Sequence, residues 1–293
     1  MTSLADLRAE LLRWYDRQHR DFPWRRTRDP YAILVSEVML QQTQASRVAE
    51  AFPVFMDRFP TAAGLAVAPS ADLLAAWSGL GYNRRALWLQ RAAALVARKG
   101  WPRDVAGLED LPGVGPYTAR AVASLAFGVP AGVVDTNVRR WLTRRFERAA
   151  AAPPTALQEL ADGLATAGAD GRTDAWTHAS MEFGAAICRS RAPRCDECPI
   201  AAGCPSRGVA APVPVPRQPP FAGSDRAMRG ALLRRLAAAA GHRLDEPDAL
   251  APLSPADAER ILAGLEADGL AHRIDGEVRL GSPMTAATDT IGA

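Results

Sequence analysis

Leu111-Pro112-Gly113-Val114-Gly115-Pro116-Tyr117-Thr118 joins two stretches whose apolar residues have helical spacing. Glycine adopts backbone angles that other residues avoid, and proline favours the first turn of a helix, so this stretch predicts a tight hairpin between two helices. Such a turn exposes backbone N–H groups beside a helix N-terminus, where a nucleic-acid phosphate can be held without a charged side chain. An ordinary helix connection would have the same Pro-Gly composition, so the stretch by itself leaves both interpretations open.

Helical patterns fill most of the chain before residue 205. Leu4, Leu7 and Leu11 have helical spacing, and Asp29-Pro30 combines a capping residue with proline at the first helical position. The apolar run that follows stops before Pro53, where we expect the helical segment to end. Further helices are expected at 71–77, 84–98, 116–126, 138–148, 155–166 and 174–188. No alternating strand pattern occurs before residue 272, so we expect a mainly α-helical protein.

All four cysteines lie within one short segment, at Cys188, Cys195, Cys198 and Cys204. Unligated thiols have no reason to gather in this way, and disulfides are typical of secreted or very small proteins. Zinc ligands usually form two close pairs, whereas one close pair flanked by two single cysteines suits a [4Fe–4S] cluster. We therefore predict an iron–sulfur cluster, with zinc as the alternative.

The composition is typical of a globular protein, since 48% of the residues are hydrophobic. We find no charged-then-apolar leader and no apolar stretch long enough to span a bilayer, and expect a cytoplasmic, nucleoid-associated monomer without membrane contact. The net charge is only +3, but Lys99 is the only lysine, and arginine is the basic residue that best suits phosphate groups. A GC-rich genome would also favour arginine codons, so the arginines gathered around Phe22-Pro23-Trp24 carry more weight than the total.

The last part of the chain has a different organisation. Residues 206–222 are rich in proline and predict an extended linker, and residues 282–293 predict a disordered tail. Between them, residues 223–281 combine helical patterns near 226–240 and 255–268 with an Asp-Gly hairpin signal, which resembles a winged helix. The second of these helices is mainly acidic, which is unfavourable for DNA, so a packing or partner-binding role is at least as plausible, with the partner unknown.

The hairpin followed by the cysteine segment resembles the helix-hairpin-helix DNA glycosylase superfamily over residues 4–205. Within it, Ser36-Glu37-Val38-Met39-Leu40-Gln41-Gln42-Thr43 and Val134-Asp135-Thr136-Asn137-Val138 resemble the adenine DNA glycosylases of the MutY type. This resemblance implies a mainly α, two-lobed fold with a small C-terminal α+β domain. The implied parts are an iron–sulfur lobe of residues 1–27 and 130–205, and a six-helix lobe of residues 28–129 containing the helix-hairpin-helix at 108–126.

Glu37 and Asp135 are the candidate catalytic carboxyls. Glu37 lies within an apolar run, which should raise its pKa unless the side chain is paired or faces solvent on an amphipathic helix. Asp135 precedes a predicted helix and would serve as its N-cap, a role compatible with catalysis. Breaking an N-glycosidic bond builds positive charge on the sugar, which a fixed carboxylate stabilises. The resemblance implies that Glu37 protonates an adenine ring nitrogen and that Asp135 stabilises the positive charge on the sugar. Asn137 would orient Asp135.

Tyr117 indicates the subclass. Glycosylases of this superfamily that also cut the strand have a lysine at this hairpin position, because an amine is needed for a Schiff base. Lys99 lies beside Gly100 at a predicted helix end, which favours a structural role. We therefore expect base excision without efficient strand cleavage, with Tyr117 in the base pocket.

Base excision also requires groups that open the duplex and receive the flipped nucleotide. The resemblance implies that Gln42, Thr43 and Tyr82 contact the base opposite the adenine. Gly113 and Gly115 belong to the turn whose backbone amides can hold a phosphate. The same resemblance places Trp24, Arg25, Leu40 and Glu182 around the adenine, although each of them, taken singly, is also compatible with the core or the surface. Many relatives have a second tyrosine where this chain has Asn83, which leaves the wedge geometry open.

The implied function is excision of adenine opposite 8-oxoguanine or guanine in double-stranded DNA. Many relatives carry a Nudix-like domain that recognises 8-oxoguanine, and the residues after 222 are too few for one. Two alternatives remain: a glycosylase for thymine or uracil mismatches or of the endonuclease III type, and a non-catalytic iron–sulfur DNA-binding redox sensor. Gln41-Gln42-Thr43 and Tyr117 argue against the first, and the pair of carboxyls argues against the second.

Overall fold

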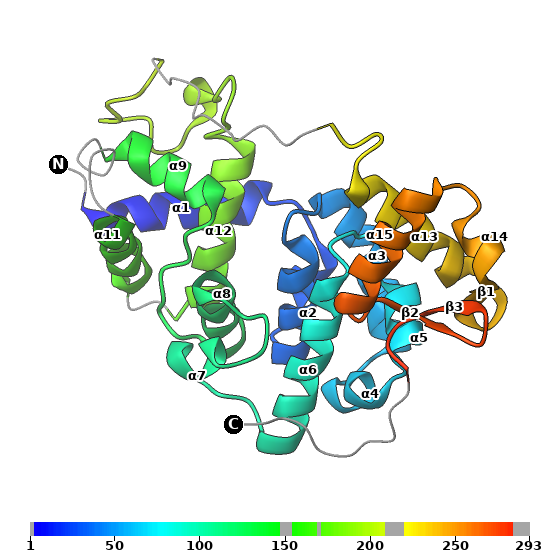
Figure 1. Cartoon of the computed structure of the whole chain (residues 1–293). Coiled ribbons are helices and arrows are strands. Elements are labelled where there is room, and N and C mark those ends of the chain that lie inside the picture. The colour runs from blue at the N-terminus through cyan, green and yellow to red at the C-terminus, as the bar shows by residue number, and fades with distance from the viewer. Residues whose placement is uncertain (1–2, 147–153, 169–170, 209–219, 284–293) are drawn as a thin grey trace. The chain divides into compact units, whose positions relative to one another are not determined.

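The computed structural model describes residues 3–146, 154–168, 171–208 and 220–283 (Figure 1). These residues are mainly helical, and the three strands among them belong to the C-terminal part, which confirms the predicted fold class. By proximity of Cα atoms the chain forms two units: Met1–Glu37 with Gly100–Pro216, and Val38–Lys99 with Arg217–Ala293. The lobe boundaries predicted at residues 27, 129 and 205 stay predictions. Most of the predicted linker and tail lies outside the described residues.

The first unit has a core of four main helices around aromatic side chains. They are α1 (Leu4–Gln18), α9 (Thr136–Arg145), α11 (Pro154–Thr166) and α12 (Thr173–Ala186). Helix α12 contacts the other three. Its Phe183 ring meets Trp14 and Trp141 edge to face, with ring centroids 5.8 and 5.7 Å apart. Each such fully buried ring contributes about 1.5–3 kcal/mol through removal from water, so α12 is the helix that fixes the others.

The hairpin predicted from residues 111–118 joins α7 (Val105–Glu109) to α8 (Pro116–Phe127). Asp104 caps α7 by accepting a 2.8 Å hydrogen bond from the Gly107 amide. Gly113 has a φ of 76°, a conformation that a side chain would strain, and Gly115 caps α8 directly before Pro116. The two glycines and the proline therefore form the turn for the reasons that their sequence suggested.

Helix α2 (Pro30–Leu40) crosses from the first unit into the second. Its N-terminus is capped by Asp29, which accepts hydrogen bonds from the Tyr31 and Ala32 amides. The prediction that the helical segment ends before Pro53 is wrong. Helix α2 ends earlier, at Leu40, and the next helix, α3 (Ala45–Arg58), continues through Pro53. Proline removes one helical hydrogen bond, but the burial of Val48, Phe52 and Phe55 on one face of α3 compensates for that loss.

The second unit contains α3, α4 (Ala62–Val67), α5 (Ser70–Ala76) and α6 (Arg84–Lys99), followed by the C-terminal domain. That domain consists of α13 (Asp225–Ala238), β1 (Arg243–Asp245), α14 (Glu246–Leu250), α15 (Pro255–Ala267), β2 (Ala271–Ile274) and β3 (Glu277–Leu280). The antiparallel sheet has the order β1-β3-β2. Asp275 and Gly276, with φ of 51° and 75°, form the predicted hairpin turn. Strand β1, which lies before residue 272, was not predicted because three residues are too few for an alternating pattern.

The C-terminal domain packs against α5 within the second unit, through α13 and β3. The Ser282 amide donates a 3.1 Å hydrogen bond to Ser70 Oγ, and Arg84 lies 3.5 Å from the Asp268 carboxylate. A Cβ added at Gly281 would lie 2.4 Å from Ser70 Oγ, so only glycine allows this approach. The domain is thus a fixed part of its unit. No helix in the described part of the chain has the length and apolar character needed to cross a membrane.

Candidate active site

Glu37 lies on α2 with only 3% of its surface exposed, among the buried side chains of Leu34, Val35 and Val38. Burial raises the pKa of its carboxyl to about 7, a hydrogen bond from Tyr117 lowers it, and the charge of Asp135 raises it further. Glu37 Oε2 has no hydrogen-bond partner among the described residues. A buried carboxyl with a free oxygen and a pKa near neutrality is suited to giving a proton to a ligand.

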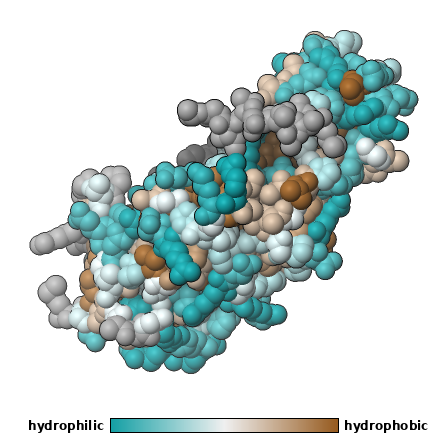
Figure 2. Space-filling view, turned by 90° about the horizontal axis from the view of Figure 1, so that it is seen from below, coloured by the Kyte–Doolittle hydropathy of each residue, from teal (hydrophilic) through white to brown (hydrophobic). Residues whose placement is uncertain are grey.

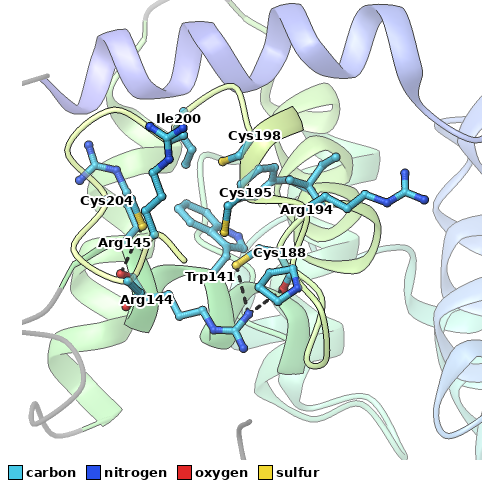
Figure 3. Close-up of a pocket in the computed structure, with 15 residues that line it drawn as sticks. Trp141, Arg144, Arg145, Cys188, Arg194, Cys195, Cys198, Ile200 and Cys204 are labelled. Carbon is cyan, nitrogen blue, oxygen red and sulfur yellow. Dashed lines mark hydrogen bonds between the residues drawn. The ribbon is translucent and has the colours of Figure 1, made fainter. Parts of the chain in front are cut away.

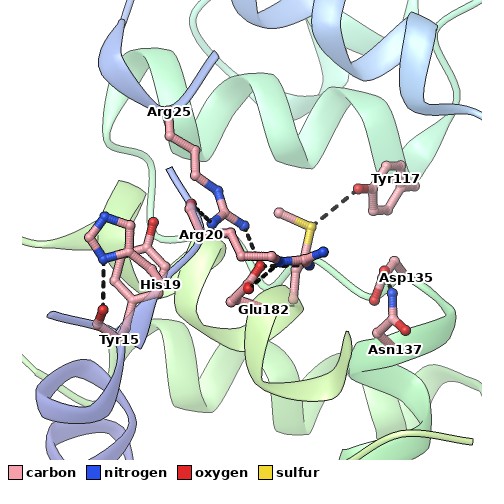
Figure 4. Close-up of polar contacts among 9 residues, drawn as sticks. Tyr15, His19, Arg20, Arg25, Tyr117, Asp135, Asn137 and Glu182 are labelled. Atoms are coloured by element: carbon pink, nitrogen blue, oxygen red, sulfur yellow. Dashed lines mark hydrogen bonds and ion pairs between the residues drawn. The ribbon is translucent and has the colours of Figure 1, made fainter. Parts of the chain in front are cut away.

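Asp135 is the N-cap of α9. Its Oδ1 accepts a 2.6 Å hydrogen bond from the Val138 amide, and its Oδ2 accepts one of 2.7 Å from Asn137 Nδ2 (Figure 4). Asn137 Oδ1 in turn accepts a 2.8 Å hydrogen bond from Arg140. Burial raises the pKa of Asp135, and these hydrogen bonds oppose the rise by stabilising the carboxylate. The result is a carboxylate held in one orientation. The motif predicted Asp135 and Asn137 for this role but did not include Arg140.

Tyr117 is in the first turn of α8, directly after the hairpin. Its hydroxyl lies 3.3 Å from Met181 Sδ, and Glu37 is its alternative acceptor. A phenol has one proton to donate, and a carboxylate is the stronger acceptor. Burial and the charges of Glu37 and Asp135 raise the pKa of Tyr117 well above 10.0, so the phenol is neutral. Within the first unit, Glu37, Tyr117 and Asp135 thus interact with one another, although they come from three different helix ends.

Glu182 on α12 is buried and bound by two arginines. Arg20 donates to both carboxylate oxygens at 2.6 and 3.0 Å, and Arg25 donates to Oε2 at 2.8 Å (Figure 4). Burial would raise the pKa of Glu182, but these hydrogen bonds outweigh it and lower the pKa. Arg25 also donates a 2.7 Å hydrogen bond to the Arg20 carbonyl, and the nearby Trp24 ring is buried and stacked on Phe22. The resemblance assigned Arg25 and Glu182 to the adenine pocket but did not assign Arg20. The signal that could have found Arg20 is its place among the arginines around Phe22-Pro23-Trp24.

The second unit holds Leu40, Gln42, Thr43 and Tyr82. Gln42 and Tyr82 have φ of 55° and 48°, which is strained for residues with a side chain, and Tyr82 is 43% exposed. The buried Arg85, a residue the sequence reasoning missed, stabilises both turns. It donates to the carbonyls of Gln41 at 2.5 Å and Gly81 at 2.9 Å, and to Thr43 Oγ1 at 3.2 Å. Burial lowers the pKa of Arg85 to about 10, which leaves it charged at neutral pH.

The four cysteines line one pocket in the first unit (Figure 3). The rest of its wall is apolar, with Trp141 and Phe183, or basic, with Arg144, Arg145, Arg194 and Arg207. Arg144 donates to the Arg189 carbonyl at 2.7 Å and lies 3.5 Å from Cys188 Sγ. Over the described ranges, no three His, Cys, Asp or Glu side chains are placed to hold a single metal ion. The pocket therefore combines four thiols, positive charge and apolar walls.

Comparison with known proteins gives a consistent class. Residues 35–165 match the model of the HhH-GPD superfamily of base excision DNA repair proteins. The adenine DNA glycosylase of Mycolicibacterium smegmatis is 41% identical over 276 residues, which cover 90% of this chain and 92% of that protein. The solved structure of a thermostable thymine-DNA glycosylase has a TM-score of 0.65 at 32% identity and covers 70% of this chain and 96% of its own. A non-covalent endonuclease III–DNA complex has a TM-score of 0.60 at 25% identity, covering 71% and 98%.

The hairpin, the buried carboxyl and these matches define an enzyme of base excision repair, a DNA glycosylase. The chain belongs to the HhH-GPD superfamily, among the adenine DNA glycosylases, which confirms the family predicted from the motifs around Glu37 and Asp135.

Proposed function

We propose that this enzyme flips an adenine mispaired with 8-oxoguanine or guanine out of double-stranded DNA and hydrolyses its N-glycosidic bond. One observation carries the proposal: Glu37, with a pKa of about 7 and an unpartnered oxygen, interacts with the phenol of Tyr117 and the carboxylate of Asp135. A general acid, a neutral phenol and a fixed carboxylate are what acid-assisted removal of a base requires.

In this mechanism the Glu37 carboxyl gives its proton to an adenine ring nitrogen, so that the base leaves as a neutral molecule. The bond between the sugar carbon and the base breaks, and positive charge develops on the sugar. Asp135, held by Val138 and Asn137, stabilises that charge. Water adds to the sugar carbon and gives up a proton to the Glu37 carboxylate. The products are adenine and an abasic site, and the acid is regenerated.

The remaining site residues would bind rather than react. Trp24, Arg25 and Glu182, together with Leu40, would surround the adenine, and Gln42, Thr43 and Tyr82 would meet the opposite base. The Gly113 and Gly115 turn would bind a phosphate through its amides. A Cβ added at Gly115 would meet no atom within 4 Å, so the backbone at this position is open to a ligand.

Strand cleavage is not expected, because the site lacks an amine. The hairpin position of the Schiff-base lysine holds Tyr117, and Lys99, the only lysine of the sequence, is exposed at the end of α6. A lysine acts as a nucleophile when burial or a neighbouring charge lowers its pKa. Lys99 is exposed and not buried, so we expect the abasic product to stay intact.

The cysteine pocket fits an iron–sulfur cluster. In a [4Fe–4S] cluster each iron takes one thiolate, so the four sulfurs lie farther apart than around one zinc ion. Four thiols in one pocket with apolar and basic walls support that arrangement. Removal of the base needs no electron transfer. A cluster bound there would therefore have a structural role and hold the segment of residues 188–204 in place. Arg144 and Arg145 would balance its negative charge.

Single-turnover base release tests the proposal. Duplexes holding adenine opposite 8-oxoguanine, guanine or thymine are compared with one holding thymine opposite guanine, under anaerobic handling. We expect adenine release opposite 8-oxoguanine and guanine, with strand breaks only after alkali. Thymine release would instead indicate a mismatch glycosylase like the solved relative, and breaks without alkali would contradict the role given to Tyr117.

A further inference from the structure

Within the second unit a cavity of about 760 Å³ lies between the C-terminal domain and the segment that contains the two strained turns. One wall is formed by Gln42, Tyr82 and Arg47, and the other by Arg226, Arg229 and Arg234 of α13. The role proposed above for Gln42 and Tyr82 concerns the opposite base and leaves the arginine wall of α13 without a function. Its two walls are fixed to each other by the contacts of α13 and β3 with α5.

The cavity is strongly positive. Among the described residues that line it, the one carboxylate belongs to Asp268, which is shared by Arg229 and Arg84. The guanidinium groups come from Arg47, Arg84, Arg85, Arg226, Arg229 and Arg234. Arg234 has no hydrogen bond or ion pair within the described part of the chain. One carboxylate cannot neutralise this set, so the cavity has an excess of positive charge that favours a polyanion.

The position of this charge indicates which polyanion. Gln42 follows Glu37 by five residues along the chain, and with Tyr82 it has the strained backbone that is typical of functional sites. Tyr82 offers an exposed aromatic ring on which a base can stack, beside the guanidinium groups. A wall that combines an aromatic ring with arginines suits a nucleotide strand better than a free anion.

We propose that α13 binds the phosphate backbone of the DNA strand opposite the excised adenine, in the cavity beside Gln42 and Tyr82. This inference rests on the proposed function. The C-terminal domain then contacts DNA through α13. It does not use α15, which corresponds to the acidic helix predicted near residues 255–268. On α15, Glu259 and Glu266 are paired with Arg273, and Asp257 is paired with Arg260. These two arginines therefore offset part of the acidic charge of α15, whereas the cavity beside α13 has an excess of arginine.

The test compares Arg234→Gln and the double variant Arg226→Gln/Arg234→Gln with Arg98→Gln, an exposed arginine at the end of α6 outside the cavity. Binding to a duplex holding adenine opposite 8-oxoguanine is measured at several salt concentrations, in a Glu37→Gln background that prevents turnover. Each lost phosphate contact should reduce the slope of log K against log salt by about 0.9. We expect the double variant to lose one to two such contacts and roughly 10-fold in affinity at physiological salt, and Arg98→Gln to match the parent.

Neutral methylphosphonate linkages then identify the strand. Placed near the 8-oxoguanine, they should weaken binding of the parent protein and abolish the difference between parent and double variant. Placed in the adenine strand, they should leave that difference intact. Unchanged slopes in the double variant, or a difference abolished only from the adenine strand, would overturn the inference. Adenine release by the unmodified enzyme is measured in parallel, so failure of the proposed function is recognised separately, and thermal unfolding of each variant shows that it is folded.

Discussion

Asn137 donates a 2.7 Å hydrogen bond to the Asp135 carboxylate and accepts one of 2.8 Å from Arg140. The carboxylate that would face the developing sugar cation is therefore oriented by a relay that begins on the next turn of its own helix. Because the relay stabilises the charged form, it opposes the rise in pKa that burial causes.

Asn137→Ala should lower the single-turnover rate of adenine release by roughly 10- to 100-fold, since a hydrogen bond to a charged group is worth about 1.5–3 kcal/mol. The pKa of Asp135 should rise further, so the loss should be greatest at acidic pH. Arg139→Ala, an exposed residue on the same helix, is the control and should leave the rate unchanged. A uniform loss at every pH would contradict a role through the charge of Asp135.

The rate of adenine release should depend on pH through two carboxyls. Above about pH 7 the rate should fall, because Glu37 loses its proton there. At acidic pH the rate should fall as Asp135, whose pKa burial raises, becomes protonated. A single-turnover profile from about pH 4 to pH 9 checks both limbs. A rate that continues to rise above neutrality would show that Glu37 acts as a base.

Glu37→Gln should reduce the rate by about 10²–10⁴-fold, the usual contribution of a general acid, yet stabilise the fold at high pH. The pKa of about 7 in the folded state is above the ordinary glutamate value of 4.5, so unfolding releases protons between these two pH values. Stability from this group is therefore lost as the pH rises through that window, by about 3 kcal/mol in total. Urea unfolding at low and high pH measures it. Equal effects of the substitution at both would refute the assignment.

Arg25→Ala should destabilise the enzyme more than Arg20→Ala. The Arg25 side chain is 9% exposed and that of Arg20 is 53% exposed, although both bind the buried Glu182. Removing the buried partner should cost about 3–5 kcal/mol, and removing the exposed one much less, because water screens it. Equilibrium urea unfolding of the two variants measures this difference.

Since the pKa of Glu182 is lowered, the stability that it contributes should be present above about pH 4.5 and lost as the pH falls.

Cys198→Ser should reduce the iron and acid-labile sulfide bound per chain and lower the thermal stability of the enzyme. Ser190→Ala, near Cys188 in sequence but not a thiol, is the control and should retain full iron content. Purification with stoichiometric zinc and no iron would reject the cluster in favour of a mononuclear site.

The sequence by itself determined the class of this protein. The glycines and prolines at 111–118 allow few backbone conformations, the cysteine spacing allows few metal centres, and the motifs around Glu37 and Asp135 identify the family. The helix end predicted at Pro53 was wrong. The hydrogen bond lost at a proline is a local cost that the sequence shows, whereas the burial of α3 that outweighs it depends on the whole unit.

Only the tertiary structure decided the state of the site groups. The pKa of Glu37 depends on its burial in the fold and on Tyr117 and Asp135, which are distant in sequence. The state of Glu182 depends on the arginines that reach it, and that of Asp135 on Asn137 and Arg140. The sequence shows that one helix of the C-terminal domain is acidic. Only the packing of the domain against α5 places the arginines of α13 beside Gln42 and Tyr82. Local pattern fixes which elements form, and the free energy of a charge depends on what surrounds it, which the fold alone supplies.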